Sequence, residues 1–351
     1  MRCGNEKQGN GRIYYLDALR ALGCLAVVLL HVSSKFTLET VGSLNYWLGI
    51  TFDGISQFAV PLFVMVSGAL HLKETYDFSK RKLNSQIGKL VVFFFGWSAI
   101  YCLVFTVLKN YVFGNQISFY DILSALFSGP YHLWFIPMMV GLYLIVPLLR
   151  LWVKKENRKL VEYFLILTFL FNTLIPGAVS LLSYGFPQYS DVFAFADGLW
   201  FRYGTGYVMY FVLGWYLRTF EIVRKKLVYS AGIAGVFISV VGTYILTVWK
   251  NDTSFFFGNF SLGILSYSIS IFTFVKSKFD NAGGVNRFVK LICDNSMGIY
   301  AMHTAVFPLF TYILRIGNAA CAIPVEFLIA FLLPLLCTSL FKRIPILKKI
   351  V

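Results

Sequence analysis

Charge is scarce in this chain of 351 residues: only 13% are Asp, Glu, Lys or Arg, whereas 58% are hydrophobic. A water-soluble domain of this length needs far more polar surface. Paired cysteines are also lacking, because no two of the six cysteines stand at C-x-x-C spacing and most lie within apolar runs. This argues against a disulfide framework and against a zinc site, so we expect no metal.

What the chain does contain is a series of apolar runs. A spanning helix needs roughly 20 apolar residues, and an open strand cannot satisfy its backbone hydrogen bonds in lipid. The sequence therefore predicts an all-α polytopic membrane protein, one domain over 1–351 with short tails at 1–12 and 342–351, and about ten transmembrane helices. The expected spans are 13–33, 48–71, 88–109, 132–150, 160–182, 202–219, 228–248, 255–275, 293–315 and 321–341. The stretch 110–131 is expected to hold a short helix or a re-entrant segment, and 183–201 to be an outer loop. The first run resembles a signal peptide, but it contains Asp17 and Arg20 and no cleavage site follows, so we interpret it as a retained helix.

The net charge of +15 comes from basic residues that gather in alternate loops. The basic stretches are 2–12, 73–89, 150–159, 218–226, 276–290 and 342–349, whereas the alternate loops hold Lys35, Lys109, Lys250 and Arg315. Lys/Arg-rich loops face the cytoplasm, so both termini are expected there. We attribute the charge to loops near anionic membrane lipid and not to nucleic-acid binding; such loops could also hold a phosphorylated cofactor.

Ionisable residues inside a span are candidates for function, and the first span has Asp17, Arg20 and His31. Asp17 and Arg20 are three residues apart and share a helix face. Arg20 and His31 fall on nearly the same face, roughly 16 Å apart along the axis. The alternative is that Asp17 and Arg20 neutralise each other and that His31 is an interfacial histidine.

The second span carries Asp53 near its outer end, at the expected depth of His31. Asp53 could fix the tautomer of His31 as a carboxylate does in a catalytic pair, or it could be a solvated turn residue. Ser67 and Gly68 could contribute to a site, or simply let another helix approach closely. His71 is expected at the cytoplasmic edge.

Two later spans carry the remaining histidines. His132 and Trp134 are expected at the outer interface, where Trp is ordinary. His303 is expected near mid-membrane with Tyr300 on the same helix face. A structural hydrogen bond to a neighbouring helix would explain His303 as well as catalysis would.

These motifs together resemble the acyltransferase 3 family over nearly the whole chain. The Arg–His spacing in an L-D-x-L/I-R context is matched by Leu16 to Arg20 and by His31. The family's P-L-F-F-x-x-S-G segment is similar to Pro61–Phe63 and Ser67–Gly68. Its H-L-W-F segment is similar to His132–Phe135, and the L-Y-L-x-x-P segment that follows is similar to Leu142–Pro147. S-x-G-I-Y-x-x-H is matched from Ser296 to His303. The family's R-x-x-R element is incomplete, because Asn84 stands three residues after Arg81; Lys89 takes a usual basic position.

The resemblance implies a membrane-embedded O-acetyltransferase that transfers an acetyl (acyl) group from acetyl-CoA to a hydroxyl of a sugar or envelope glycan. The acceptor is free or lipid-linked, and the setting is the bacterial cytoplasmic membrane. An unassisted hydroxyl is a poor nucleophile, so a general base is needed, and His31 is the candidate. The further candidates are Arg20, Asp17, Asp53, His303 and Tyr300 for catalysis, and Arg20, Arg81, Lys82, Lys89 and Ser67 for binding the donor.

Two other classes remain open from the sequence. A transporter or flippase for an envelope precursor would have a similar number of spans, although the inverted repeats and paired broken helices of many transporters are not evident. The second alternative is a lipid-linked or peptidoglycan-modifying relative, for example a membrane partner in amino-acid transport beside a racemase.

Overall fold

The computed structural model of the chain describes residues 12–73, 79–108, 110, 114, 116–189, 206–280, 286–345 and 347–350. These residues form helices and connecting turns, and none of them lies in a strand. The all-α fold class is thus confirmed. The elements are α1 (Tyr14–Ser33), η1 (Ser34–Leu38), α2 (Leu44–Ser56), α3 (Ala59–His71), α4 (Lys80–Tyr101), η2 (Cys102–Leu108), α6 (Phe119–Ser128), η3 (Tyr131–Trp134), α7 (Phe135–Trp152), α8 (Arg158–Phe169), η4 (Leu170–Leu174), α9 (Ile175–Gly185), η5 (Pro187–Tyr189), α12 (Val208–Thr219), α13 (Lys225–Lys250), η7 (Phe255–Phe257), α14 (Leu262–Phe279), α15 (Arg287–Met302), η8 (His303–Val306), α16 (Phe307–Leu309), η9 (Phe310–Leu314), α17 (Ala319–Phe341) and η10 (Leu347–Ile350).

Within the described residues, nine helical stretches are long and apolar enough to cross a membrane. They correspond to nine of the expected spans, and most extend a few residues beyond the expected limits. The tenth expected span, 202–219, contains α12, which is only 12 residues long. Residues 202–205 of that span lie outside the described residues. Residues 190–201 of the expected outer loop also lie outside them. The stretch 110–131 holds the short helix α6, whose N-terminus is closed by a capping box between Ser118 and Asp121.

The second span is two helices and not the single helix expected over 48–71. α2 ends at Ser56 and α3 begins at Ala59. Pro61 has no amide proton to donate to the carbonyl of Gln57, four residues earlier, so one continuous helix would lose a hydrogen bond at this point.

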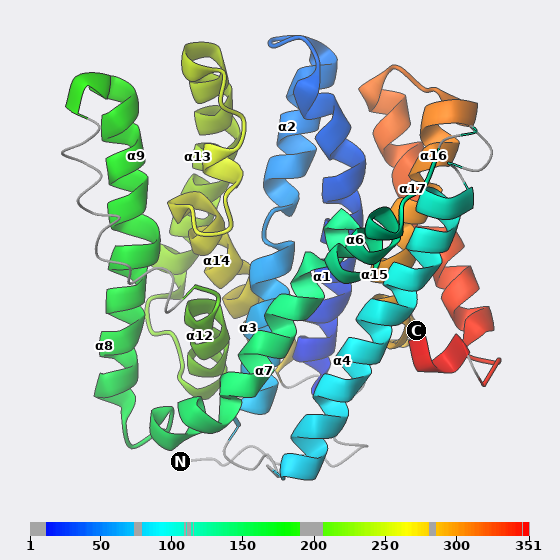
Figure 1. Ribbon diagram of the computed structural model, residues 1–351. Coiled ribbons are helices and arrows are strands. Elements are labelled where there is room, and N and C mark those ends of the chain that lie inside the picture. The colour runs from blue at the N-terminus through cyan, green and yellow to red at the C-terminus, as the bar shows by residue number, and fades with distance from the viewer. Residues whose placement is uncertain are drawn as a thin grey trace.

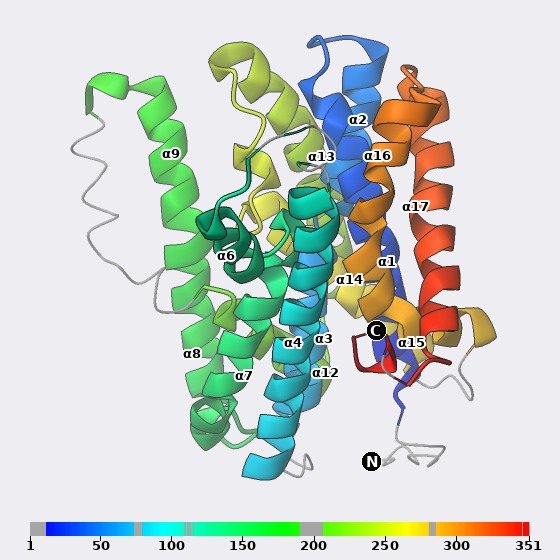
Figure 2. The same ribbon diagram turned by 45° about the vertical axis from the view of Figure 1, so that its right-hand side comes forward.

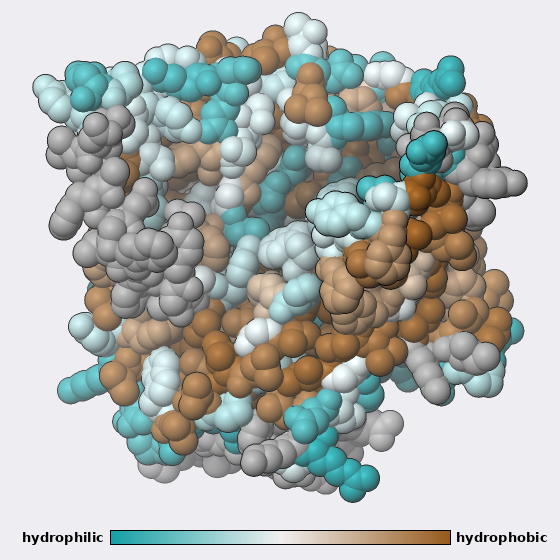
Figure 3. Space-filling model, in the orientation of Figure 1, coloured by the Kyte–Doolittle hydropathy of each residue, from teal (hydrophilic) through white to brown (hydrophobic). Residues whose placement is uncertain are grey.

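α1 lies at the centre of the molecule, in contact with α2, α3, α14, α15 and α17. α8 and α9 form one flank and α15 to α17 the other, with α1 and α3 between them (Figures 1 and 2). On the face seen in Figure 3, hydrophobic residues dominate the lower half, whereas hydrophilic residues gather at the two rims and line a hollow in the upper centre. The start of α1 and the last turn η10 lie at the same lower end of the bundle (Figure 1).

α3 and α12 cross closely through reciprocal glycines. A Cβ atom at Gly68 would lie 1.8 Å from the carbonyl oxygen of Phe211, and one at Gly214 would lie 1.9 Å from that of Met65. Any larger residue would therefore push the two backbones apart. Close approach through small residues is a main way in which helices associate in lipid, so the packing interpretation of Gly68 is confirmed.

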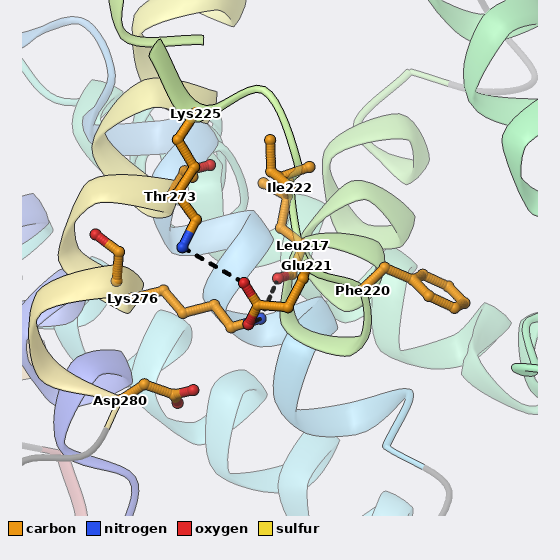
Figure 4. A pocket seen from close by; sticks show the side chains of 9 residues that line it. Leu217, Phe220, Glu221, Ile222, Lys225, Thr273, Lys276 and Asp280 are labelled. Atoms are coloured by element: carbon orange, nitrogen blue, oxygen red, sulfur yellow. Dashed lines mark hydrogen bonds and ion pairs between the residues drawn. The ribbon is translucent and has the colours of Figure 1, made fainter. Parts of the chain in front are cut away.

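A small polar pocket of about 130 Å³ lies where α12 ends and α13 and α14 pass (Figure 4). The Lys276 ammonium donates hydrogen bonds to the carbonyl oxygens of Leu217 and Arg218, both at 2.9 Å. Glu221 pairs with Lys225 at 3.5 Å and with Lys276 at 3.7 Å. These contacts satisfy the last carbonyls of α12, so we assign this cluster to helix capping.

Candidate active site

Three imidazole rings from three separate segments meet near one end of α1. The ring centroid of His303, at the start of η8, lies 5.1 Å from that of His31 in α1 and 5.2 Å from that of His132 in η3. His132 and His303 are 2% and 0% exposed, and His31 is partly buried. His132 therefore lies within the protein next to His303, and its position at the outer membrane interface stays a prediction.

Polar side chains hold this histidine cluster in a defined orientation. The Nδ1 atom of His132 is 3.0 Å from the Thr304 hydroxyl, and its Nε2 atom is 3.2 Å from the Ala301 carbonyl oxygen. An N–H must face that carbonyl, so Nε2 carries the proton and Nδ1 accepts from Thr304. Tyr101 of α4 donates to the same carbonyl at 2.8 Å, and Tyr300 donates to the backbone oxygen of His132.

The tautomer of His303 follows from a single contact. Its Nδ1 atom lies 2.7 Å from the carbonyl oxygen of Tyr300 and must donate to it. In the neutral ring Nε2 is then a proton acceptor, and this atom is buried without a hydrogen-bond partner in the described chain. A buried acceptor without a partner is rare and calls for an explanation. The ring that carries it lies beside the ring of His31.

His31 is also exposed to a cavity of about 410 Å³. The cavity is lined by residues of the end of α1 and of η1, by Tyr131, by α16 and η9, and by α17. The ring of Tyr131 packs edge-on against His31 at 5.6 Å. His31 is thus the member of the histidine cluster that a molecule in the cavity can reach, because His132 and His303 do not line it.

The same cavity contains an ion pair that the sequence analysis did not predict. The ammonium group of Lys35 in η1 lies 2.5 Å from Oε1 of Glu326 in α17. The side chain of Glu326 is 1% exposed and that of Lys35 is 45% exposed. Glu326 is the only charged residue of the expected span 321–341, and a lone carboxylate within an apolar span was the signal that could have revealed it.

Asp17 has a different partner from the one considered. Its carboxylate is 2.8 Å from Arg12, whose other guanidinium nitrogen is 2.8 Å from Asp294 of α15. Arg12 thus ties the start of α1 to α15. Burial lowers the pKa of the Arg12 guanidinium, but the carboxylates of Asp17 and Asp294 outweigh this effect and raise that pKa above its ordinary value. The alternative in which Asp17 neutralises Arg20 is wrong.

Arg20 is partly buried and forms no ion pair or side-chain hydrogen bond within the described chain. It lies within electrostatic range of His71. Two further arginines cap the nearby end of α3. Arg150 donates to the carbonyl oxygens of His71 and Lys73, at 3.0 and 2.9 Å, and Arg218 donates to that of Ala69 at 2.8 Å. These two guanidinium groups therefore stabilise the end of α3, whereas Arg20 forms no such hydrogen bond in the described chain.

The remaining predicted donor-binding residues lie at this same end. Arg81, Lys82 and Lys89 are exposed on the first turns of α4. Lys82 is close enough to His71 to affect it electrostatically. Ser67 lies on α3, where its carbonyl oxygen contacts Nδ1 of His71 at 2.8 Å. The structure thus separates the predicted residues into a basic group around Arg20 and the histidine cluster.

Asp53 belongs to neither group by direct contact. Its carboxylate accepts a hydrogen bond of 2.6 Å from Gln57, one turn later in the chain. The carbonyl oxygen of the next residue, Gly54, accepts from Tyr267 of α14 at 2.7 Å. No hydrogen bond joins Asp53 to His31 in the described residues. The proposed carboxylate–imidazole pair is therefore absent from this structure.

Comparison with known proteins identifies one family whose model covers most of the chain. No curated protein matches the chain, and no solved structure does. The acyltransferase domain of the Acyl_transf_3 family matches residues 13–343, which is nearly the whole chain and includes the histidine cluster, the cavity and the basic group. The chain therefore belongs to the acyltransferase 3 family.

Proposed function

We propose that the protein is a membrane-embedded O-acetyltransferase that transfers an acetyl group from acetyl-CoA to a hydroxyl group of a sugar or cell-envelope glycan. We place it in the bacterial cytoplasmic membrane, and the acceptor is free or lipid-linked. The observation that carries the proposal is that His31 lines a cavity while His303 stands behind it, in a chain that belongs to an acyltransferase family. Family membership does not favour the alternative of a transporter without acyl transfer.

His31 acts as the general base in this mechanism. The imidazole takes the proton of the acceptor hydroxyl while the hydroxyl oxygen attacks the thioester carbonyl. A C–O bond forms, the C–S bond breaks, and coenzyme A leaves as a thiolate that receives the proton. The ring of His303 packs beside that of His31 and supports its position, and the part of His31 that lines the cavity is left for the hydroxyl.

Arg20 is the proposed anchor for the charged part of the donor. It is partly buried and forms no ion pair within the described chain, and a guanidinium group suits phosphate oxygens. Arg81, Lys82 and Lys89 add positive charge at the same end, and Ser67 lies nearby on α3. Arg20 and His31 are about 16 Å apart along α1, a length that an extended pantetheine arm can cover. The donor would then lie along α1 with its thioester at the cavity.

The test uses the purified full chain in lipid vesicles with labelled acetyl-CoA. Released coenzyme A and label in a panel of methyl glycosides are measured separately. We expect both signals from the wild type and a loss of both from His31→Ala. Equal coenzyme A release from the two proteins would refute the role of His31. Movement of a glycoside across the vesicle membrane without any release of coenzyme A would favour a transporter.

A further inference from the structure

We infer that the ion pair of Lys35 and Glu326 forms the acceptor-binding subsite of the cavity, and that Glu326 accepts a hydrogen bond from a sugar hydroxyl next to the one that is acetylated. This inference rests on the proposed function and assigns a saccharide with two neighbouring hydroxyl groups to the cavity.

The first argument is the state of the Glu326 carboxylate. Its Oε1 atom pairs with Lys35 at 2.5 Å, whereas its Oε2 atom is buried without a hydrogen-bond partner in the described chain. A buried carboxylate is strongly unfavourable unless it is paired and hydrogen-bonded. Half of this carboxylate is therefore unsatisfied within the protein, although the side chain lines a cavity.

The second argument is the position of the pair. Glu326 and His31 line the same cavity of about 410 Å³, which is large enough for a monosaccharide unit but small enough to bring both groups to one ligand. A hydroxyl group both donates and accepts hydrogen bonds. One hydroxyl at His31 and its neighbour at Oε2 of Glu326 would orient the reacting oxygen, and fixed orientation is a large part of catalysis.

The third argument is the exposure of the partner, Lys35. Lys35 has a flexible four-carbon stem, and its side chain is 45% exposed at the cavity. In the proposed complex, a rotation of that stem opens Oε2 to the ligand while the ammonium group keeps Glu326 paired. Thr311 and Tyr131 add hydroxyl groups to the wall. The lining thus combines one carboxylate, one ammonium and aromatic surface, which suits a polyhydroxylated ligand.

The experiment compares Glu326→Gln with the wild type on a methyl glycoside and on its analogue that lacks the neighbouring hydroxyl. Loss of a hydrogen bond to a charged group corresponds to about 10- to 100-fold in affinity. We expect the wild type to discriminate against the deoxy analogue by that factor in kcat/KM. Glu326→Gln should raise the acceptor KM to a similar extent and should no longer discriminate. The KM for acetyl-CoA should not change.

Glu221→Gln is the matched control, because Glu221 also pairs with lysines but lines the separate pocket of Figure 4. It should keep the wild-type acceptor KM. Lys35→Arg retains the ion pair and should still discriminate against the deoxy analogue. An active Lys35→Arg variant shows that a change at this ion pair does not by itself misfold the protein. Unchanged KM and discrimination in Glu326→Gln would overturn the inference and leave the proposed function intact.

If the wild type transfers no acetyl group at all, the proposed function fails and the subsite is decided by binding alone. Saturation-transfer NMR of the methyl glycosides with the purified full chain provides that measurement. A signal that Glu326→Gln abolishes and Glu221→Gln retains supports the subsite. Equal signals from both variants, or none from the wild type, overturn it.

Discussion

The rings of His31 and His303 lie 5.1 Å apart between centroids and are tilted by 32°, although 272 residues separate them in the chain (303 − 31). One ring lines the cavity and the other is fully buried. The contact with the Tyr300 carbonyl fixes the tautomer of His303, so that its buried Nε2 atom is a hydrogen-bond acceptor without a partner in the described chain. The proposed function gives the two residues different roles: in it, His31 contacts the acceptor and His303 positions His31.

Replacing His31 by Ala should lower kcat by about 10²- to 10⁴-fold, because the hydroxyl loses its general base. Binding of acetyl-CoA should change little, since the proposed anchor is at the other end of α1. Single-turnover transfer in vesicles measures the rate, and equilibrium binding of coenzyme A measures the donor site. A variant that loses donor binding as well would point to a structural role for His31.

His303→Asn retains a side-chain amide that can donate to the carbonyl oxygen of Tyr300 but has no atom in place of Nε2. We expect kcat to fall by up to about tenfold, because the ring that packs beside His31 is lost and an aromatic ring pair contributes about 0.5–1.5 kcal/mol, with little change in either KM. Thr304→Ser, which keeps the hydroxyl that contacts His132, is the control and should be active. Wild-type kcat in His303→Asn would show that His303 does not position the base.

Arg20→Ala should raise the KM for acetyl-CoA by about 10- to 100-fold, since a charge-assisted contact to phosphate is lost. The KM for the acceptor should stay the same. Lys250→Ala removes an exposed positive charge at the end of α13 and serves as the control for net charge. Equal donor KM values for the two variants would exclude Arg20 as the anchor.

Gly68→Ala should destabilise the protein by about 1–3 kcal/mol or prevent its folding, because the added methyl group overlaps the backbone of α12. Gly141→Ala is matched to it, since Gly141 also lies inside a helix but has nothing within 4 Å of the added atom. The midpoint of thermal unfolding in detergent compares the two. Similar midpoints would contradict the close crossing of α3 and α12.

The basic loops predict that both chain ends face the cytoplasm. In a background without other cysteines, Cys321, which is exposed at the start of α17, should react with a membrane-impermeant maleimide added outside intact cells. Ser79→Cys, at the exposed start of α4, should react only after the cells are opened. The reverse labelling pattern would invert the topology.

Much of the fold could be read from the sequence because each helix in lipid satisfies its own backbone hydrogen bonds. A span is therefore recognisable from about 20 consecutive residues without knowledge of its neighbours. The resemblance to the family could also be recognised from the sequence, because the family's motifs are short and local. These motifs contain Arg20, His31, Tyr300 and His303. The break between α2 and α3 was missed, although Pro61 marked its place.

The contacts between spans were decided only by the tertiary structure. The sequence placed Arg20 beside Asp17, but folding brings Arg12 to that carboxylate and joins it to Asp294, 282 residues away. Likewise, nothing near Lys35 indicates Glu326, which is 291 residues distant. Helical spacing determines which residues share a face, whereas the partner of that face depends on how small residues such as Gly68 and Gly214 let the helices approach. The sequence by itself thus determined that the chain spans a membrane and which polar residues it carries there, and the packing of the helices decided which of them meet.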